Sequence, residues 1–288
     1  KQSSENRRIL QIAVPSIISN ITVPLLGLID VTIVGHLGSP AYIGAIAVGG
    51  MLFNIIYWIF GFLRMGTSGM TSQAYGQHDL NEINRLLIRS VGVGLFIALC
   101  LLILQYPILN AAFTLIQTTE EVKQLATTYF YICIWGAPAM LGLYGFAGWF
   151  IGMQNSRFPM YIAITQNIVN IIASLSFVYL LDMKVAGVAA GTLIAQYAGF
   201  FMAILLYMRY YSTLRKRIVW KDIIQKQAMY RFFRVNRDIF FRTLCLVIVT
   251  MFFTSAGAAQ GEVVLAVNTL LMQLFTLFSY CLLYTSPS

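Results

Sequence analysis

The segment PLLGLIDVTIVGHLG, residues 24–38, places an acidic side chain in an otherwise apolar stretch. Asp30 is the one Asp, Glu, Lys or Arg between residues 9 and 37. An ionised carboxylate in membrane hydrocarbon costs roughly 3 kcal/mol on insertion scales, and more in simulations. Acidic residues at such positions commonly hold a proton, a cation or a cationic ligand, so Asp30 is the first candidate for a functional site.

The residues before Asp30 predict a helix that bends and faces a polar interior. On an ideal helix Ser16 and Ser19 project to roughly the same side as Asp30. Pro15 and Pro24 each remove a backbone hydrogen bond and favour a kink. In a membrane the freed carbonyl groups need partners in a protein-lined or hydrated interior. We therefore expect both prolines to be helix-bending positions.

Polar residues also recur at helical spacing in three other apolar segments. The sets are Asn54, Tyr57 and Gly61; Asn167, Asn170 and Ser174; and Thr192 with Gln196. Such side chains either line the same cavity as Asp30 or bond neighbouring helices together, at about 0.6 kcal/mol per contact on average. The bonding role is favoured for Asn54 and Gln196, whereas both roles stay open for the set that contains Asn170.

The sequence carries no pattern typical of an enzyme or a metal site. It contains no Walker loop, HExxH, GxSxG or paired carboxylates. The four cysteines are scattered singly, without CxxC or zinc-like spacing, at Cys100, Cys133, Cys245 and Cys281. We therefore expect no catalytic residues, no bound metal and no organic cofactor.

Composition defines the elements that must position Asp30. The 288 residues are 59% hydrophobic and 10% charged, with a mean hydropathy of +0.76, whereas soluble domains carry roughly 25% charged residues. Apolar runs of membrane-spanning length occur near residues 9–34, 43–63, 90–110, 126–151, 159–181, 186–208, 239–258 and 263–283. None alternates in polarity as a transmembrane β-strand would. The sequence predicts an all-α integral membrane protein, a polytopic bundle of eight spanning helices.

The positive charges predict the orientation of the bundle. Of 19 Lys and Arg residues, sixteen fall in segments that lie on one side of the membrane if the N-terminus is cytoplasmic. Lys123 and Lys184 fall on the other side, and Arg64 is expected at the inner end of the second helix. Ten of the sixteen lie between Arg209 and Arg242. The segment Arg209–Asp238 is expected to be a cytoplasmic linker against anionic lipid headgroups rather than a nucleic-acid site.

The sequence after this linker faintly repeats the beginning of the chain. NRDIFFRTL echoes NRRILQIAV, and LAVNTLLM echoes IAVGGMLF. A repeat that begins after the sixth helix predicts twelve helices in a complete protein, of which this chain holds eight. The expected divisions are a six-helix lobe at 1–208, a basic linker at 209–238, two helices of a second lobe at 239–280, and an aberrant tail at 281–288.

Three segments resemble the multidrug and toxic compound extrusion (MATE) family, most closely its DinF-like branch. They are AVPSIISNITVPLLGLIDVTIVGHLGSPAYIGAIAVGGMLF, FLRMGTSGMTSQAYG, and NIVNI with VAGVAAGTLIAQ. The resemblance runs from about Arg7 to Tyr280 and implies two six-helix lobes around a central cavity. It further implies cation-coupled antiport of bulky, often cationic or amphipathic compounds. By the same resemblance Asp30, Asn170 and Thr192 are the cation-coupling residues. The helical spacing described above adds candidate cavity residues: Asn167, Ser174, Gln196, Asn54 and Tyr57.

The chain departs from the family pattern at three places. An acidic residue of many relatives is Ser174 here, a first-helix tyrosine is Leu26, and the seventh span has no acid inside it. Because burial favours the neutral form of a lone carboxylate, these departures favour a proton over sodium as the coupling ion. The residues after Tyr280, CLLYTSPS, look foreign to the family and suggest a truncated reading frame.

These observations predict an efflux antiporter in the plasma membrane, with small organic substrates and membrane lipids as its partners. We expect no nucleic-acid partner, and a monomer when the protein is complete. One alternative is a lipid-linked oligosaccharide flippase of the same superfamily, which would line its cavity with cationic residues, whereas these spans hold little positive charge beyond Arg64. The other is a membrane fragment that does not transport.

The charge bias yields a test of topology. In a variant without Cys281, a cysteine introduced at Ser39 should react with a membrane-impermeant thiol reagent in intact cells, whereas one at Ser212 should not, because positive loops stay in the cytoplasm. Labelling at Ser212 alone would reverse the predicted orientation.

Overall fold

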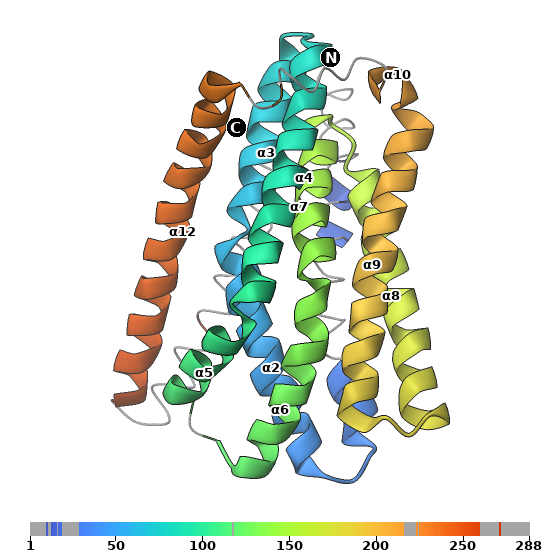
Figure 1. Ribbon diagram of the computed structural model, residues 1–288, viewed down its shortest axis with the longest axis vertical. Helices are drawn as coiled ribbons and strands as arrows, with labels where there is room; N and C mark the ends of the chain where they lie inside the picture. Colours follow the sequence, from blue (N-terminus) through green and yellow to red (C-terminus); the bar gives the residue numbers. More distant parts are fainter. Residues whose placement is uncertain are drawn as a thin grey trace.

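The computed structural model describes residues 10, 13–15, 17–18, 29–116, 118–215, 223, 225–259 and 271, and every regular element in these ranges is helical (Figure 1). A helical segment at 29–35 carries Asp30. The elements after it are α2 (Pro40–Ile59), α3 (Phe62–Gly76), α4 (Leu80–Ile103), α5 (Gln105–Leu115), α6 (Glu120–Cys133), the 3₁₀ turn η1 (Ile134–Gly136), α7 (Ala137–Gly152), α8 (Arg157–Leu175), the π-helical η2 (Ser176–Leu180), α9 (Lys184–Tyr210), α10 (Ser212–Arg215) and α12 (Lys226–Ala259).

Five segments within the described residues are long and apolar enough to cross a membrane. They are Pro40–Gly76, Leu80–Ile103, Glu120–Gly152, Arg157–Leu180 and Lys184–Tyr210. These five correspond to the second to sixth predicted spans, so the all-α membrane fold is confirmed. Most of the first predicted span, nearly all of the eighth, and the tail after Tyr280 lie outside the described residues.

The second span is longer than predicted. It breaks at Phe60 and Gly61 and continues through α3 to Gly76, so that the prediction of a helix end near residue 63 is wrong. Arg64 therefore lies within the 37-residue segment rather than at its inner end. Hydropathy did not predict this continuation of the span, because its buried residues include Gly66, Thr67 and Thr71. These small side chains pack against other helices instead of entering hydrocarbon.

The basic segment after the sixth span also differs from the expectation of a separate linker and helix. Residues from Lys226 onward form the first turns of α12, which continues without a break to Ala259. Phe232 and Asn236 of these turns are buried, whereas Arg234 and Arg237 are exposed. These turns of α12 have one buried face and one charged face. Their basic side chains therefore led to the prediction of a linker instead of a helix.

The helices pack as a bundle in which α7 lies among α3, α4 and α9 (Figure 1). Along the other contacts α8 runs against α9, and α2 lies against α6. Most side chains of α7 are buried, including Trp149, whose indole Nε1 donates to the Ile83 carbonyl at 2.8 Å. Trp149 also stacks edge-on against Tyr207 and Tyr211 at the end of α9.

Small residues permit the closest helix contacts. A Cβ on Gly94 of α4 would lie 2.7 Å from the Leu141 carbonyl oxygen of α7. The GxxxG pair Gly148–Gly152 faces α3, and the pair Gly187–Gly191 faces η2 and α8. Both pairs therefore serve helix packing, which in a membrane depends on close van der Waals contact.

Side chains at the helix starts fix where the helices begin. The Ser39 hydroxyl accepts from Ala41 N ahead of Pro40, and Asp79 Oδ1 accepts from the backbone N–H groups of Asn81 and Glu82. At the start of α6 the Thr119 hydroxyl accepts from Val122 N, and the first turn carries the acidic residues Glu120 and Glu121. Each cap satisfies N–H groups that have no partner inside the helix.

Two glycines of α4 give a matched test of this packing. Gly94→Ala should lower the stability of the bundle by about 1–3 kcal/mol, because its methyl group collides with the α7 backbone. Gly92→Ala has open space within 4 Å and should be neutral or stabilising by up to about 1 kcal/mol. Thermal unfolding in detergent would measure both, and equal midpoints for the two variants would contradict the described α4–α7 contact.

Candidate functional site

The carboxylate of Asp30 is buried at a meeting point of three helices. It lies in the helical segment at 29–35, and the residue is 3% exposed. The Thr192 hydroxyl of α9 donates to Asp30 Oδ2 at 3.1 Å. Since the seven-residue segment at 29–35 and α9 are far apart in sequence, this bond exists only in the folded bundle.

Asn170 of α8 completes the arrangement. Its Nδ2 donates to Thr192 Oγ1 at 3.2 Å, and Asn170 is fully buried. The hydroxyl thus accepts from the amide and donates to the carboxylate, the arrangement that suits an acceptor-only group. The structure therefore brings Asp30, Asn170 and Thr192 together in one chain of hydrogen bonds, here called the Asp30 chain.

Several oxygen atoms beside the Asp30 chain have no hydrogen-bond partner. They are Asp30 Oδ1, Asn170 Oδ1 and Ser174 Oγ, all buried. Buried polar atoms in proteins are almost always satisfied by protein, water or an ion, so such a set marks a place where another species binds. A proton on the carboxylate, a water molecule or a small cation would each satisfy it.

Close packing of α8 on α9 holds this site together. A side chain on Gly191 would collide with Ser174 of α8. Because Gly191 directly precedes Thr192, the absence of a Cβ here lets the Thr192 hydroxyl approach Asn170. This is a structural reason for glycine at position 191.

The other predicted cavity residues divide into two groups. Asn167 is buried and donates from Nδ2 to the Ala163 carbonyl, while Tyr57 is buried with an unpartnered hydroxyl. Gln196 also has a buried, unpartnered Oε1, which lies against Gly136 of η1. Asn54 does not join them, because its side chain is exposed although Tyr57, one helical turn further on, is buried.

The two predicted bending positions are only partly described. Pro15 is helical and buried, and Pro24 lies outside the described residues, as do Ser16 and Ser19. Bending at these prolines therefore stays a prediction.

Sequence reasoning missed a polar cluster at the end of the bundle where α4 begins. Arg89 is 3% exposed, and its guanidinium donates to Glu82 Oε1 and to the Ile223 carbonyl, each at 2.8 Å. Asn84 donates to the Leu214 carbonyl and accepts from the Tyr207 hydroxyl. The spacing of Glu82 and Arg89, two helical turns, was the available signal, but it does not reveal the bond from Arg89 to the distant Ile223 carbonyl.

Within the described residues no group of three or more His, Cys, Asp or Glu side chains could hold a metal ion. The Asp30 chain offers one carboxylate with neutral hydroxyl and amide partners. Such a donor set suits a proton or a monovalent cation better than a divalent metal, which prefers several charged ligands.

Membrane-length helices packed around a buried carboxylate define this protein as a polytopic membrane protein. A family model described as MatE matches residues 15–176, and the chain belongs to the MatE family. Members of this family are transporters rather than enzymes.

Two curated relatives and one solved structure illustrate the similarity. The chain is 35% identical to DNA damage-inducible protein F of Escherichia coli, over 97% of this chain and 61% of that protein. It is 28% identical to multidrug and toxin extrusion protein 1 of Danio rerio, over 69% and 33% of the two chains. The bent form of the Vibrio cholerae MATE transporter VcmN superposes with a TM-score of 0.80 at 20% identity, over 98% and 64%. The chain thus spans about three fifths or less of these proteins.

The contact between Gly136 and Gln196 gives a test of the geometry near the site. Gly136→Ala should destabilise the bundle by about 1–3 kcal/mol, because the new methyl group collides with the Gln196 side chain. The double variant Gly136→Ala, Gln196→Ala removes the colliding atoms and should regain most of the loss, as thermal unfolding would measure. A double variant as unstable as the sum of the two single ones would place Gln196 elsewhere.

Proposed function

We propose that this chain carries the coupling lobe of an exporter of drugs and toxic compounds, driven by antiport of a cation, with Asp30 as the coupling carboxylate. The observation that carries the proposal is the Asp30 chain: one buried acid, bonded by Thr192 and Asn170 from two other helices. The names of the relatives, which include multidrug and toxin extrusion proteins, support the same activity.

The hydrogen bonds indicate where the coupling ion would bind. Asp30 Oδ2 is occupied by the Thr192 hydroxyl, whereas Oδ1 has no partner. A proton added at Oδ1 leaves the donor chain from Asn170 through Thr192 intact. Oδ1 is therefore the atom at which protonation changes the charge of the site without breaking its structure.

Competition for this carboxylate couples the two transported species. When Asp30 is ionised, its charge attracts a cationic or amphipathic substrate into the bundle. When it is protonated, that attraction is lost and the substrate is released. Each ligand lowers the affinity for the other by the same factor, which is the thermodynamic requirement for exchange.

A proton is proposed as the coupling ion in preference to sodium. Sodium prefers several oxygen ligands, and the unpartnered Asn170 Oδ1 and Ser174 Oγ could supply two of them beside the carboxylate. The single negative charge of the site favours the proton, because a proton requires only one basic atom. Measuring transport under each gradient separately distinguishes the two ions.

The remaining features of the proposal concern the setting of the protein. We place it in the plasma membrane with a cytoplasmic N-terminus, as the charge bias predicts, with lipids around it, and expect a monomer. The flippase alternative is less well supported. The buried cation of the described residues, Arg89, is bonded to Glu82 and to a backbone carbonyl, far along the chain from Asp30.

The central test is Asp30→Asn in the full-length protein that contains this chain. Asparagine keeps the size and the acceptor oxygen but cannot be ionised, so the variant should fold while proton-driven export of a cationic dye from proteoliposomes falls at least about tenfold. Asn170→Ala and Thr192→Ala each remove one neutral hydrogen bond and should reduce the rate by about two- to tenfold.

Asp182→Asn makes the same chemical change on an exposed loop and serves as the control. Dye export by Asp30→Asn at the wild-type rate under a pH gradient would refute the coupling role. Wild-type export that follows a sodium gradient and does not respond to a pH gradient would leave the coupling role of Asp30 in place and identify sodium as the coupling ion.

A further inference from the structure

Helix α12 contacts the rest of the bundle along the turns nearest its start. Phe232 and Asn236 are almost fully buried, and Thr243 and Val247 continue the same face. The Phe240 ring lies 5.8 Å from the Phe62 ring at the start of α3. Beyond Val247 the side chains whose burial is described, Ile248, Val249 and Phe252, are all exposed. The contact with α3 is thus confined to the first half of α12, which includes the end of the basic segment (Figure 1).

A polar side chain fits into a notch of α3 at the centre of this contact. The Asn236 amide lies against Gly66, where any Cβ would collide with it. Asn236 Nδ2 donates to the Phe232 carbonyl of its own helix, while its Oδ1 is buried without a hydrogen-bond partner. An interface held by apolar packing alone would have no such atom, so this contact is close but incompletely satisfied.

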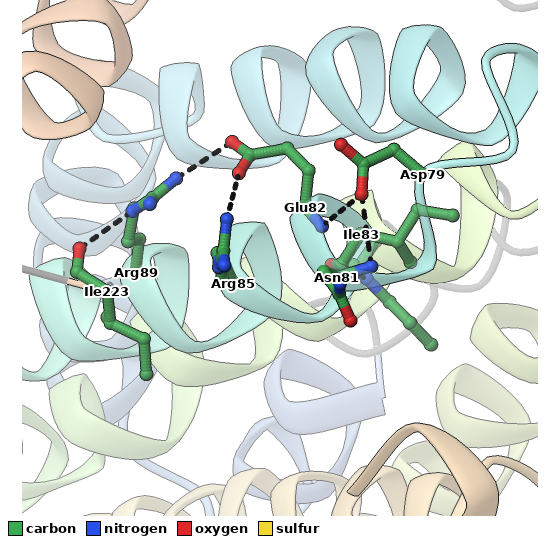
Figure 2. Close-up of polar contacts among 8 residues, drawn as sticks. Asp79, Asn81, Glu82, Ile83, Arg85, Arg89 and Ile223 are labelled. Carbon is green, nitrogen blue, oxygen red and sulfur yellow. Dashed lines mark hydrogen bonds and ion pairs between the residues drawn. The ribbon is translucent and has the colours of Figure 1, made fainter. Parts of the chain in front are cut away.

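Buried side chains of α4 hold the chain that leads into α12. Figure 2 shows Glu82 between Arg85 and Arg89, and the Arg89 guanidinium reaching the Ile223 carbonyl. Phe232 and Arg89 also line one small cavity together with Met70 of α3 and Leu86 of α4. The same end of the bundle therefore has two attachments to the chain after α9: Asn236 joins α12 itself to α3, and Arg89 holds Ile223, which precedes α12.

We propose that the Gly66–Asn236 contact and the Arg89–Ile223 bond form a gate on the cytoplasmic side of the bundle, closed in this structure. The proposal rests on the proposed transport function, because an exporter must open its interior to the cytoplasm to load substrate. Opening requires α12 to leave α3, since the Gly66–Asn236 contact joins these two helices and the Arg89–Ile223 bond restrains the residue that leads into α12. Water that enters on opening would satisfy Asn236 Oδ1, so the closed contact can be released without losing a fully bonded network.

Cross-linking tests the gate directly in the full-length protein. In a background with every native cysteine replaced by alanine, including the four of this chain, Gly66→Cys with Asn236→Cys places two thiols within disulfide reach. Oxidation should stop dye export in proportion to the cross-linked fraction, by about tenfold when nine tenths is cross-linked, and reduction should restore it. Export that continues at full rate in the cross-linked protein would overturn the gate.

A matched control joins two helices within the same lobe. Gly199 of α9 lies against the Gln166 side chain of α8 as closely as Gly66 lies against Asn236. Gln166→Cys with Gly199→Cys should therefore cross-link equally well, but should change export less than about twofold, because α8 and α9 move together. Inhibition by both cross-links would mean that any restraint blocks the protein and would refute the specific role of the α3–α12 contact.

A second measurement separates failure of the gate from failure of the proposed function. Spin labels at the exposed Gln77, which directly follows α3, and at Gln227 of α12 should show two distance populations, and Gly66→Ala should shift the protein toward the longer one by about tenfold. Adding Asn236→Ala removes the colliding amide and should reverse that shift. Absence of export in every variant, with two distances still present, would reject the transport proposal and keep the gate; a single short distance in all variants would reject the gate.

Discussion

The structure of this protein depends on the burial of one carboxylate in a bundle that is surrounded by hydrocarbon. Lipid offers no hydrogen-bond donor, so Asp30 must be satisfied by other helices or be neutral. Thr192 and Asn170 supply that environment from α9 and α8. Their positions require the two helices to approach closely, which explains the lack of a side chain at Gly191. A chemical requirement at one atom thus sets the spacing of three helices.

Close helix approach recurs through the bundle, and it determines what the chain can tolerate. In water, burying large apolar side chains drives helices together, whereas in a membrane the lipid is as apolar as leucine. Gly94, Gly148 and Gly152 let backbones meet at distances at which dispersion forces and polar contacts become effective. The exposed apolar side chains on the outer faces of α4, α8 and α9 are suited to contact with lipid.

The Asp30 chain and the proposed gate lie in different parts of the molecule but share a physical feature. Each contains a buried oxygen without a hydrogen-bond partner, Asp30 Oδ1 in one and Asn236 Oδ1 in the other. Such atoms make a state less stable than a fully bonded alternative, and a ligand or water can satisfy them. A transporter needs two states of similar free energy, and incomplete hydrogen bonding is one way to keep them close.

The sequence by itself determined the class of the fold, five of the membrane spans, and three residues that the structure brings together, Asp30, Asn170 and Thr192. Hydropathy was enough to predict the spans of α8 and α9, because a run of about 20 apolar residues is stable only inside a membrane or a protein core. Helical spacing, together with the family resemblance, selected Asp30, Asn170 and Thr192. Only the tertiary structure decided the extent of α3 and α12, whose buried faces are small or polar and whose charges mask the helical pattern. It also decided that Asn54 stands apart from the site and that Arg89 binds the Ile223 carbonyl. These outcomes depend on contacts between residues distant in sequence, and local composition does not encode which partner a polar side chain meets.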